Sequence, residues 1–485
     1  MIKNFLKASG WVLAGNLSSK IINFLSLSIL ARLLGPQGLG VYNAVLSTTM
    51  SINQISDFGT SIVLQKESSK MSTNNDPQLG SLFMTAVFLQ LFLNSIICFI
   101  ILLWPDFFFN EFFKELGSIS LLYYSIPLII FQCLAQLALT FIVGLGEFRL
   151  YSIRLILTSI ITLVFLVIFL HTLNSNAITA LIATIFSVVI NIAITWYLVF
   201  ISAKKKNITI NKGYWIENLR LIRNDGVIYY IGNTLIGAIV TLVLVQLFAK
   251  YISLENYGFL RIGSSLSAIL GIIPAAIQPV TINFLSKANE NINSLKSVQI
   301  RFLFYFIIVI TLMILIFLNP IISILFGSQY LLGKDVISFI LSVQIIILSS
   351  GIFSNFLVAS GHTTFIGIIS TLAALSNLIL AIFLIPRYGI YGFYISHFVG
   401  YFSGFLVMGC KEALKVNFRV SIQVKYMIGL FILSFMGLIP IFIIDSFLIL
   451  IIYGLAFIII LTIIFYNKIL KQNEKAIFKK MLRFE

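Results

Sequence analysis

The residues best placed to do chemistry are the few polar side chains inside long apolar runs. Lys20 is one of them, and a charge at the centre of a membrane-spanning helix costs about 2.5–3.5 kcal/mol on insertion scales. Asn16, Lys20 and Asn23 are spaced i, i+4 and i+7, so they share one helix face. Such a face turns towards a cavity or towards partner helices. The pattern indicates either a ligand-binding cavity or a lysine paired with a carboxylate.

Asp57 is the clearest carboxylate inside an apolar run, and Asn53 precedes it by one helical turn. An intramembrane carboxylate can carry a proton or a sodium ion, or it can simply pair with Lys20. Arg261 lies near the end of another apolar run. Its side chain can contact a substrate, or it can extend outwards to the membrane surface.

A cavity lined by Lys20 and Arg261 would be cationic and would favour an anionic ligand, of which phosphate is the obvious candidate. The two cations are far apart in the sequence, so this cavity requires two parts of the chain to face each other. The predicted substrate-binding residues are Lys20, Arg261, Asn16 and Asn23. The predicted coupling group is Asp57.

Motifs typical of enzymes are missing from the sequence. The three histidines are His171, His362 and His397. They cannot form the HExxH zinc motif, and there is no Walker A run. The cysteines, Cys98, Cys133 and Cys410, have no paired spacing and are interpreted as packing residues. We therefore expect no enzyme activity, no catalytic residue, no metal and no cofactor.

The composition of the 485-residue chain is 59% hydrophobic and only 10% charged, with a mean hydropathy of +1.06. These values exclude a soluble enzyme and a disordered protein, and they predict an all-α polytopic membrane protein. Breaking the chain at polar clusters gives about 14 transmembrane helices. They lie near 10–34, 39–63, 81–104, 118–143, 152–171, 177–202, 226–250, 257–281, 299–319, 336–359, 363–385, 390–410, 426–444 and 447–467.

The net charge of +16 follows from where the basic residues lie. With the N-terminus inside, 25 of the 32 lysines and arginines fall on the inner side and only five on the outer side. This bias predicts that both termini are cytoplasmic. It also explains the charge without any nucleic acid. We interpret the basic run at 204–206 and the basic tail at 468–483 as anchors to anionic membrane lipids.

Two stretches of the chain repeat each other at an offset of 214–218 residues. Ala31-Arg32 and Gly40 align with Ala249-Lys250 and Gly258. The repeat unit contains six predicted spans, so both copies insert the same way up, as in transporters built from parallel repeats. This predicts an N-lobe at 1–202, a basic cytoplasmic linker at 203–225 and a C-lobe at 226–425. Spans 13 and 14 and the basic tail follow at 426–485.

Short motifs across residues 10–410 carry a family resemblance. They include Leu34-Gly35-Pro36, Asp57-Phe58-Gly59, Gly144-Leu145-Gly146-Glu147-Phe148-Arg149, Pro320-Ile321-Ile322-Ser323-Ile324-Leu325-Phe326-Gly327 and Leu384-Ile385-Pro386-Arg387-Tyr388-Gly389. Together they resemble the polysaccharide repeat-unit flippases of the multidrug/oligosaccharidyl-lipid/polysaccharide exporter superfamily. These flippases serve the synthesis of O-antigen, capsule or exopolysaccharide.

The resemblance implies two six-helix lobes in a V that opens alternately to either side, with two extra C-terminal helices here. It also implies that a polyprenyl-diphosphate-linked oligosaccharide moves from the inner to the outer leaflet of a bacterial cytoplasmic (inner) membrane. An ion gradient or the membrane potential would drive this movement. Lys20 would hold the diphosphate, and a polysaccharide polymerase and glycosyltransferases would be partners.

Three alternatives differ in what they require of the interior and the loops. A cation-coupled multidrug exporter of the same superfamily would favour a carboxylate-rich cavity, whereas Asp57 is the one clear interior carboxylate. A membrane polysaccharide polymerase or glycosyltransferase usually has large outer loops, and all loops here are short. The lipid II flippase branch also has fourteen helices but carries several cavity arginines, and this chain has few intramembrane cations.

Overall fold

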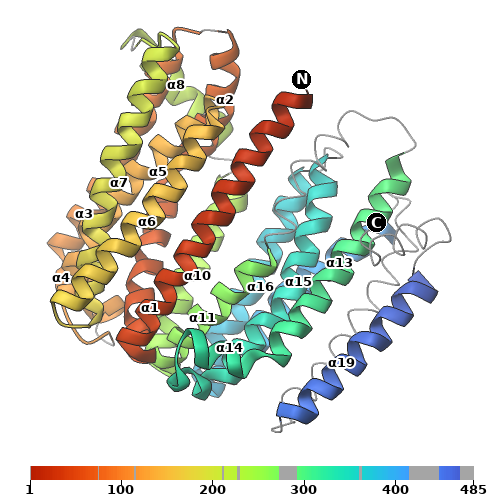
Figure 1. Ribbon diagram of the computed structural model, residues 1–485. Coiled ribbons are helices and arrows are strands. Elements are labelled where there is room, and N and C mark those ends of the chain that lie inside the picture. The colour runs from red at the N-terminus through yellow and green to blue at the C-terminus, as the bar shows by residue number, and fades with distance from the viewer. Residues whose placement is uncertain are drawn as a thin grey trace. The chain divides into compact units, whose positions relative to one another are not determined.

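The computed structural model describes residues 2–74, 76–113, 116–209, 212–226, 230–271, 292–359, 363–413 and 447–469. Every regular element within these ranges is helical, and none is a strand (Figure 1). The prediction of an all-α membrane protein is therefore confirmed. Predicted span 13 and the end of the basic tail lie outside the described residues, as does the end of predicted span 8.

The chain divides into two compact units. The first unit comprises Met1–Gly258 and Asn377–Ser396, and the second comprises Phe259–Ser376 and His397–Glu485. The first contains α1 (Ile2–Ser56), α2 (Thr60–Asn74), α3 (Leu79–Leu103), α4 (Pro105–Phe108), α5 (Ser120–Gly144), α6 (Phe148–Thr172), α7 (Ala177–Lys205), α8 (Trp215–Leu221) and α10 (Ile236–Leu247). The second contains α13 (Ile292–Ile316), α14 (Leu318–Leu325), α15 (Lys334–Ala359) and α19 (Phe447–Ile464). Residues of α11 (Leu254–Leu270), α16 (Thr363–Tyr388) and α17 (Ile390–Ala413) belong to both units.

Within the described residues, eight helices are long and apolar enough to cross a membrane. A ninth span results if α13 and α14, which meet at a 66° bend, are counted as one. The helix over Gly10–Ser56 has 47 residues, a length of about 70 Å, whereas a bilayer core measures about 30 Å. Its backbone leaves the helical conformation at Gly35, with φ 69°. The arms on either side of Gly35 correspond to the first two predicted spans.

The second predicted span, 39–63, is interrupted in the structure. The helix α1 ends at Ser56 and α2 begins at Thr60. Between them, Phe58 has φ 46° and Gly59 has φ 78°, a left-handed conformation that costs a non-glycine residue about 1–2 kcal/mol. The Phe58 ring stacks on Tyr230 at a centroid distance of 5.3 Å. Tyr230 also donates a hydrogen bond to the Ile55 carbonyl at the end of α1.

The two aligned glycines of the sequence repeat contact each other's segment in the first unit. A methyl group on Gly40 would overlap the Leu254 carbonyl oxygen, and one on Gly258 would overlap the Pro36 carbonyl oxygen. Leu254 aligns with Pro36, and Gly258 with Gly40, at the same 218-residue offset. The contact is therefore reciprocal, as expected where two copies of one repeat meet.

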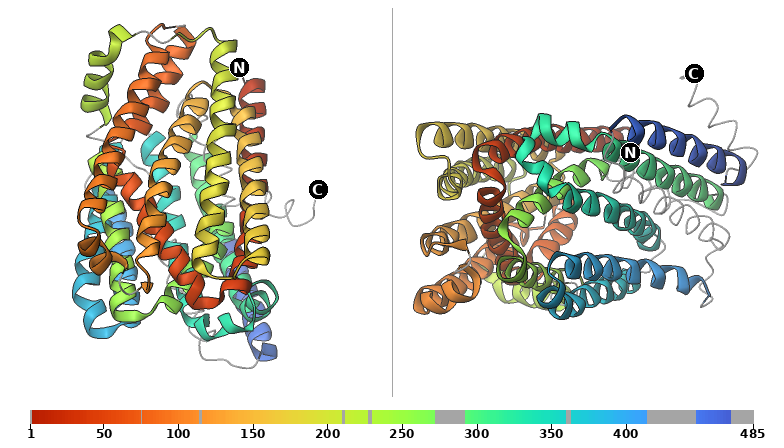
Figure 2. Two further views of the ribbon diagram at one scale, coloured as in Figure 1. Left: turned by 90° about the vertical axis from the view of Figure 1, so that its left-hand side faces the viewer. Right: turned by 90° about the horizontal axis from the view of Figure 1, so that it is seen from below.

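Helices α6 and α7 run side by side in the first unit (Figures 1 and 2). A hydrophobic core of this unit lies where α2, α3 and α5 pack together, with Trp196 and Val199 of α7 against them. At its centre Phe83 stacks on Phe141 at 4.4 Å and tilts against Trp196 at 5.4 Å. This packing fixes the positions of the helices that carry the polar residues described below.

The predicted basic linker is tied to the first unit by specific contacts. Lys205 pairs with Glu147 at 3.0 Å. Lys206 donates to the Leu145 carbonyl at 2.7 Å and to Ser72 Oγ at 2.6 Å. Burial lowers the pKa of the Lys206 ammonium, and the Glu147 carboxylate opposes that shift. The linker is therefore held against the ends of α2 and α5.

In the second unit, α19 packs on α13. The Tyr305 ring stacks on Phe465 at 4.2 Å, and the Tyr305 and Thr462 hydroxyls share a hydrogen bond of 2.6 Å. The predicted last span, which lies outside the sequence repeat, is thus fixed to its neighbour by both apolar and polar contacts.

Candidate functional site

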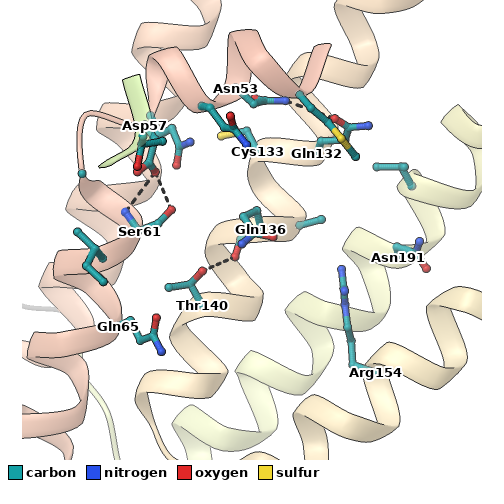
Figure 3. Close-up of a pocket in the computed structure, with 18 residues that line it drawn as sticks. Asn53, Asp57, Ser61, Gln65, Gln132, Cys133, Gln136, Thr140, Arg154 and Asn191 are labelled. Atoms are coloured by element: carbon teal, nitrogen blue, oxygen red, sulfur yellow. Dashed lines mark hydrogen bonds between the residues drawn. The ribbon is translucent and has the colours of Figure 1, made fainter. Parts of the chain in front are cut away.

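A polar cavity of about 590 Å³ opens inside the first unit (Figure 3). Its lining comes from α1, α2, α3, α5, α6 and α7 and from one residue of the short helical segment Ile231–Leu235. All of these elements belong to one compact unit. A volume of this size is in the range of small-molecule sites in proteins, about 300–1,000 Å³.

Carboxamide side chains dominate the polar lining. They are Asn53, Gln54, Gln65, Gln90, Gln132, Gln136 and Asn191. On α5, Gln132, Gln136 and Thr140 are spaced by four residues and so lie on one helix face. Each carboxamide has both a donor and an acceptor group, which suits a ligand whose own groups both donate and accept hydrogen bonds.

Asp57 lies on this cavity at the break between α1 and α2. Its Oδ1 accepts hydrogen bonds from Ser61 Oγ at 2.6 Å, Thr60 Oγ1 at 2.8 Å and the Ser61 backbone N–H at 3.2 Å (Figure 3). The carboxylate therefore caps the first turn of α2, where backbone N–H groups lack helical partners. Asp57 combines a structural role at this break with exposure to the cavity.

Arg154 is the cationic residue of the cavity lining. It lies near the start of α6, and its Nε donates to Thr195 Oγ1 on α7 at 3.1 Å. This bond orients the planar guanidinium beside Asn191 (Figure 3). The polar side chains of the cavity thus comprise one carboxylate, one guanidinium, three hydroxyls and seven neutral amides.

Two cavity amides have buried oxygens without a hydrogen-bond partner. They are Asn53 Oδ1 and Asn191 Oδ1. Asn53 Nδ2 makes one long contact with Gln132 Oε1 at 3.5 Å. Asn191 is only 8% exposed. Buried polar groups in folded proteins are normally paired, so these amides retain hydrogen-bonding capacity at the cavity.

The structure places the predicted site residues in different surroundings. Asp57 lines the cavity, whereas Lys20, Asn16 and Asn23 are not among its lining residues. Lys20 and Asn23 are exposed on α1, and Asn16 is half-buried within reach of the Tyr151 side chain. Arg261 is exposed on the part of α11 that belongs to the second unit. Their joint role as a substrate site stays a prediction.

The sequence reasoning missed Arg154 and most of the carboxamides. Arg154 is one of the 25 basic residues assigned to the inner side, and it is the seventh residue of α6. The spacing of Gln132, Gln136 and Thr140 was a usable signal, because a stripe of period four in an apolar run marks an inward face. Gln90 is an isolated polar residue in the apolar run that forms α3, and no sequence pattern predicted that it would line the cavity.

The fold and the polar cavity define a multi-pass helical membrane protein with a known transporter fold. The structure is similar to "Lipid II flippase MurJ, inward closed conformation", with a TM-score of 0.69 and 16% identity, covering 94% of this chain and 99% of that one. It is also similar to an inward-facing multidrug resistance MATE family transporter of the MOP superfamily, with a TM-score of 0.61 and 16% identity, covering 82% and 96%. A third match is a MOP superfamily transporter from Pyrococcus furiosus, with a TM-score of 0.55 and 18% identity, covering 85% and 96%.

Residues 5–221 match the family described as polysaccharide biosynthesis protein. No curated protein matches the sequence significantly. The match over residues 5–221 and the shared fold agree with the predicted resemblance: this part of the chain is similar to the polysaccharide biosynthesis family, and the chain has the fold seen in solved MOP superfamily transporters.

Proposed function

We propose that the protein is a flippase that moves a polyprenyl-diphosphate-linked oligosaccharide from the inner to the outer leaflet of a bacterial cytoplasmic membrane. The single observation that carries the proposal is the overlap of family match and cavity. Residues 5–221 match the polysaccharide biosynthesis family, and this range includes every residue that lines the cavity except Thr234. The region that relates the chain to polysaccharide synthesis is thus the region that forms a polar cavity.

The proposed cycle is alternating access driven by an ion gradient or the membrane potential. Lys20 binds the diphosphate, and Asn16, Asn23 and Arg261 assist it. Lys20, Asn23 and Arg261 are exposed on α1 and α11 and Asn16 is partly exposed, which leaves these side chains able to reach a ligand. Asp57 couples or gates transport from the break between α1 and α2. Protonation of its carboxylate would remove acceptor capacity from the bonds that start α2.

The proposed setting follows from charge and chemistry. The positive-inside bias places both termini in the cytoplasm, where the lipid-linked substrate is assembled. Anionic lipids contact the basic run at 204–206. Glycosyltransferases act before this step, because the repeat unit must be made on the inner side. A polysaccharide polymerase acts after it, because the flipped units are joined on the outer side.

The test is reconstituted transport in liposomes that contain a short-chain polyprenyl-diphosphate oligosaccharide. An enzyme added outside then measures how much substrate becomes accessible. Wild-type protein should transport, and Lys20→Ala should transport far less. Full activity in Lys20→Ala would assign Lys20 a structural role instead.

The same vesicles separate the proposal from its rivals. Export of cationic dyes without flipping would favour the multidrug exporter. Growth of the glycan in the presence of a sugar donor would favour the polymerase or glycosyltransferase. Either result in correctly folded protein would refute the flippase proposal.

A further inference from the structure

The cavity of the first unit has the hydrogen-bonding chemistry of a sugar site. Its seven carboxamides and three hydroxyl side chains greatly outnumber its two charged groups. Sugar hydroxyls both donate and accept, and carboxamides do the same. A diphosphate only accepts, so it could not pair with the acceptor oxygens of these carboxamides.

The charges of the cavity also favour a sugar over a diphosphate as its ligand. Asp57 would repel a diphosphate, and it lies on the same cavity as Arg154. The Arg154 guanidinium is already bonded to Thr195 through Nε. The two opposite charges leave the lining without a net positive charge, in contrast to the clusters of cations that usually bind phosphate groups.

The unpaired amides supply a second, independent indication of a ligand. Asn191 lines the cavity, is more than nine-tenths buried and has an amide oxygen without a partner. Gln65 and Gln136 are exposed to the cavity rather than packed. A ligand with several hydroxyls could satisfy such groups together, and the volume of about 590 Å³ has room for a short oligosaccharide.

We propose that this cavity holds the sugars of the transported molecule, while its diphosphate binds elsewhere on the protein. The proposal rests on the proposed function and deepens it, because it assigns one part of the substrate to one compact unit. It also assigns sugar binding and diphosphate binding to different places on the protein, whereas a single cationic cavity would have to bind both groups.

The experiment measures binding to the full-length protein in nanodiscs with two kinds of probe. The sugar probes are lipid-free disaccharides of a hexose, an N-acetylhexosamine and a hexuronic acid. The diphosphate probe is farnesyl diphosphate, which carries no sugar. The test variants are Gln136→Leu and Gln65→Leu, which remove exposed cavity carboxamides. Gln246→Leu is the matched control, because Gln246 is not among the cavity residues.

At least one disaccharide should bind the wild type saturably. Combining Gln136→Leu with Gln65→Leu should weaken that binding about tenfold, the effect of losing one or two hydrogen bonds. Affinity for farnesyl diphosphate should stay unchanged, and Gln246→Leu should change neither. Melting temperatures of all variants verify that they are folded.

Three results would overturn the inference. They are a wild type that binds no disaccharide, a double variant with unchanged sugar affinity, and a double variant that loses farnesyl diphosphate binding equally. A protein that flips the lipid-linked substrate but gives one of these results would retain the proposed function and lose only the sugar assignment. A protein that binds neither kind of probe and transports nothing would refute both.

Discussion

The reciprocal glycine contact gives a sharp prediction about stability. Replacing Gly40 by Ala places a methyl group against the Leu254 carbonyl oxygen, and replacing Gly258 by Ala places one against the Pro36 carbonyl oxygen. In each case the obstacle is backbone, which cannot rotate away as a side chain does. Each substitution must therefore push the two segments apart.

The change in unfolding free energy caused by each substitution has two opposing contributions. Overpacking of a tight contact costs about 1–3 kcal/mol, and the rigid backbone obstacle places Gly40→Ala towards the upper end. Alanine in place of glycine inside a helix returns up to about 1 kcal/mol. Gly237→Ala in α10 isolates that second term, because a methyl group there meets no atom within 4 Å.

The double variant tests whether the two glycines form one contact. The methyl position at each glycine is 3.3 Å from the backbone nitrogen of the other. Separating the segments once should relieve both overlaps, so the cost of Gly40→Ala plus Gly258→Ala should be well below the sum of the single costs. Thermal unfolding in detergent at a fixed scan rate measures this, since unfolding of large proteins is often irreversible.

The expected order of melting temperatures is Gly237→Ala highest, then wild type, then the two single variants and the double variant close together. A Gly40→Ala protein as stable as Gly237→Ala would refute the close approach. Single costs that add fully would refute the idea of one shared contact.

Three further predictions concern other parts of the structure. Asp57→Ala should destabilise the protein by about 0.5–2 kcal/mol through loss of the cap on α2, as measured by unfolding. Asp57→Asn should be nearly as stable as the wild type but should lose gradient-driven transport, as measured by a flux assay. Burial lowers the pKa of the Lys206 ammonium in the folded protein, so the unfolded chain keeps that proton up to a higher pH. Between the lowered pKa and the ordinary lysine pKa, the stability of the wild type relative to Lys206→Met should therefore increase with pH. Tyr305→Phe and Thr462→Ala should each destabilise the packing of α19 on α13, with a coupling of about 0.5–1.5 kcal/mol in a double-mutant cycle.

Each of these expectations has a result that contradicts it. Gradient-driven transport by Asp57→Asn at the wild-type rate would exclude a coupling role for the carboxylate. A stability difference between wild type and Lys206→Met that is flat with pH would contradict the lowered pKa. Strict additivity of the Tyr305 and Thr462 substitutions would mean that their hydrogen bond contributes nothing.

The helices could be predicted well from the sequence because the backbone of an apolar run in a membrane must satisfy its own hydrogen bonds, which an α-helix does. The predicted spans at 81–104, 152–171 and 177–202 match α3, α6 and α7 to within a few residues. The same apolar runs concealed the break at 57–59, because it is stabilised by contacts that form only in the fold. Tyr230 is far from Phe58 in the sequence and packs on it in the structure.

The candidate site was harder to predict from the sequence. Lys20 was prominent because it is an isolated charge, but a cavity is defined by what several helices present together. Arg154 and Gln90 come from helices separated by more than forty residues and line the same cavity. Only the packing of α2, α3, α5, α6 and α7 brings such residues together. Asp57 was the predicted residue that proved to lie on it.

The most direct test of the central claim is the rate at which wild-type protein flips a lipid-linked oligosaccharide in sealed liposomes. The comparison is with protein-free liposomes and with liposomes that carry the same lipid diphosphate without sugars. We expect fast, protein-dependent flipping of the glycosylated lipid. Flipping no faster than in protein-free liposomes, by protein whose folding has been verified, would contradict it.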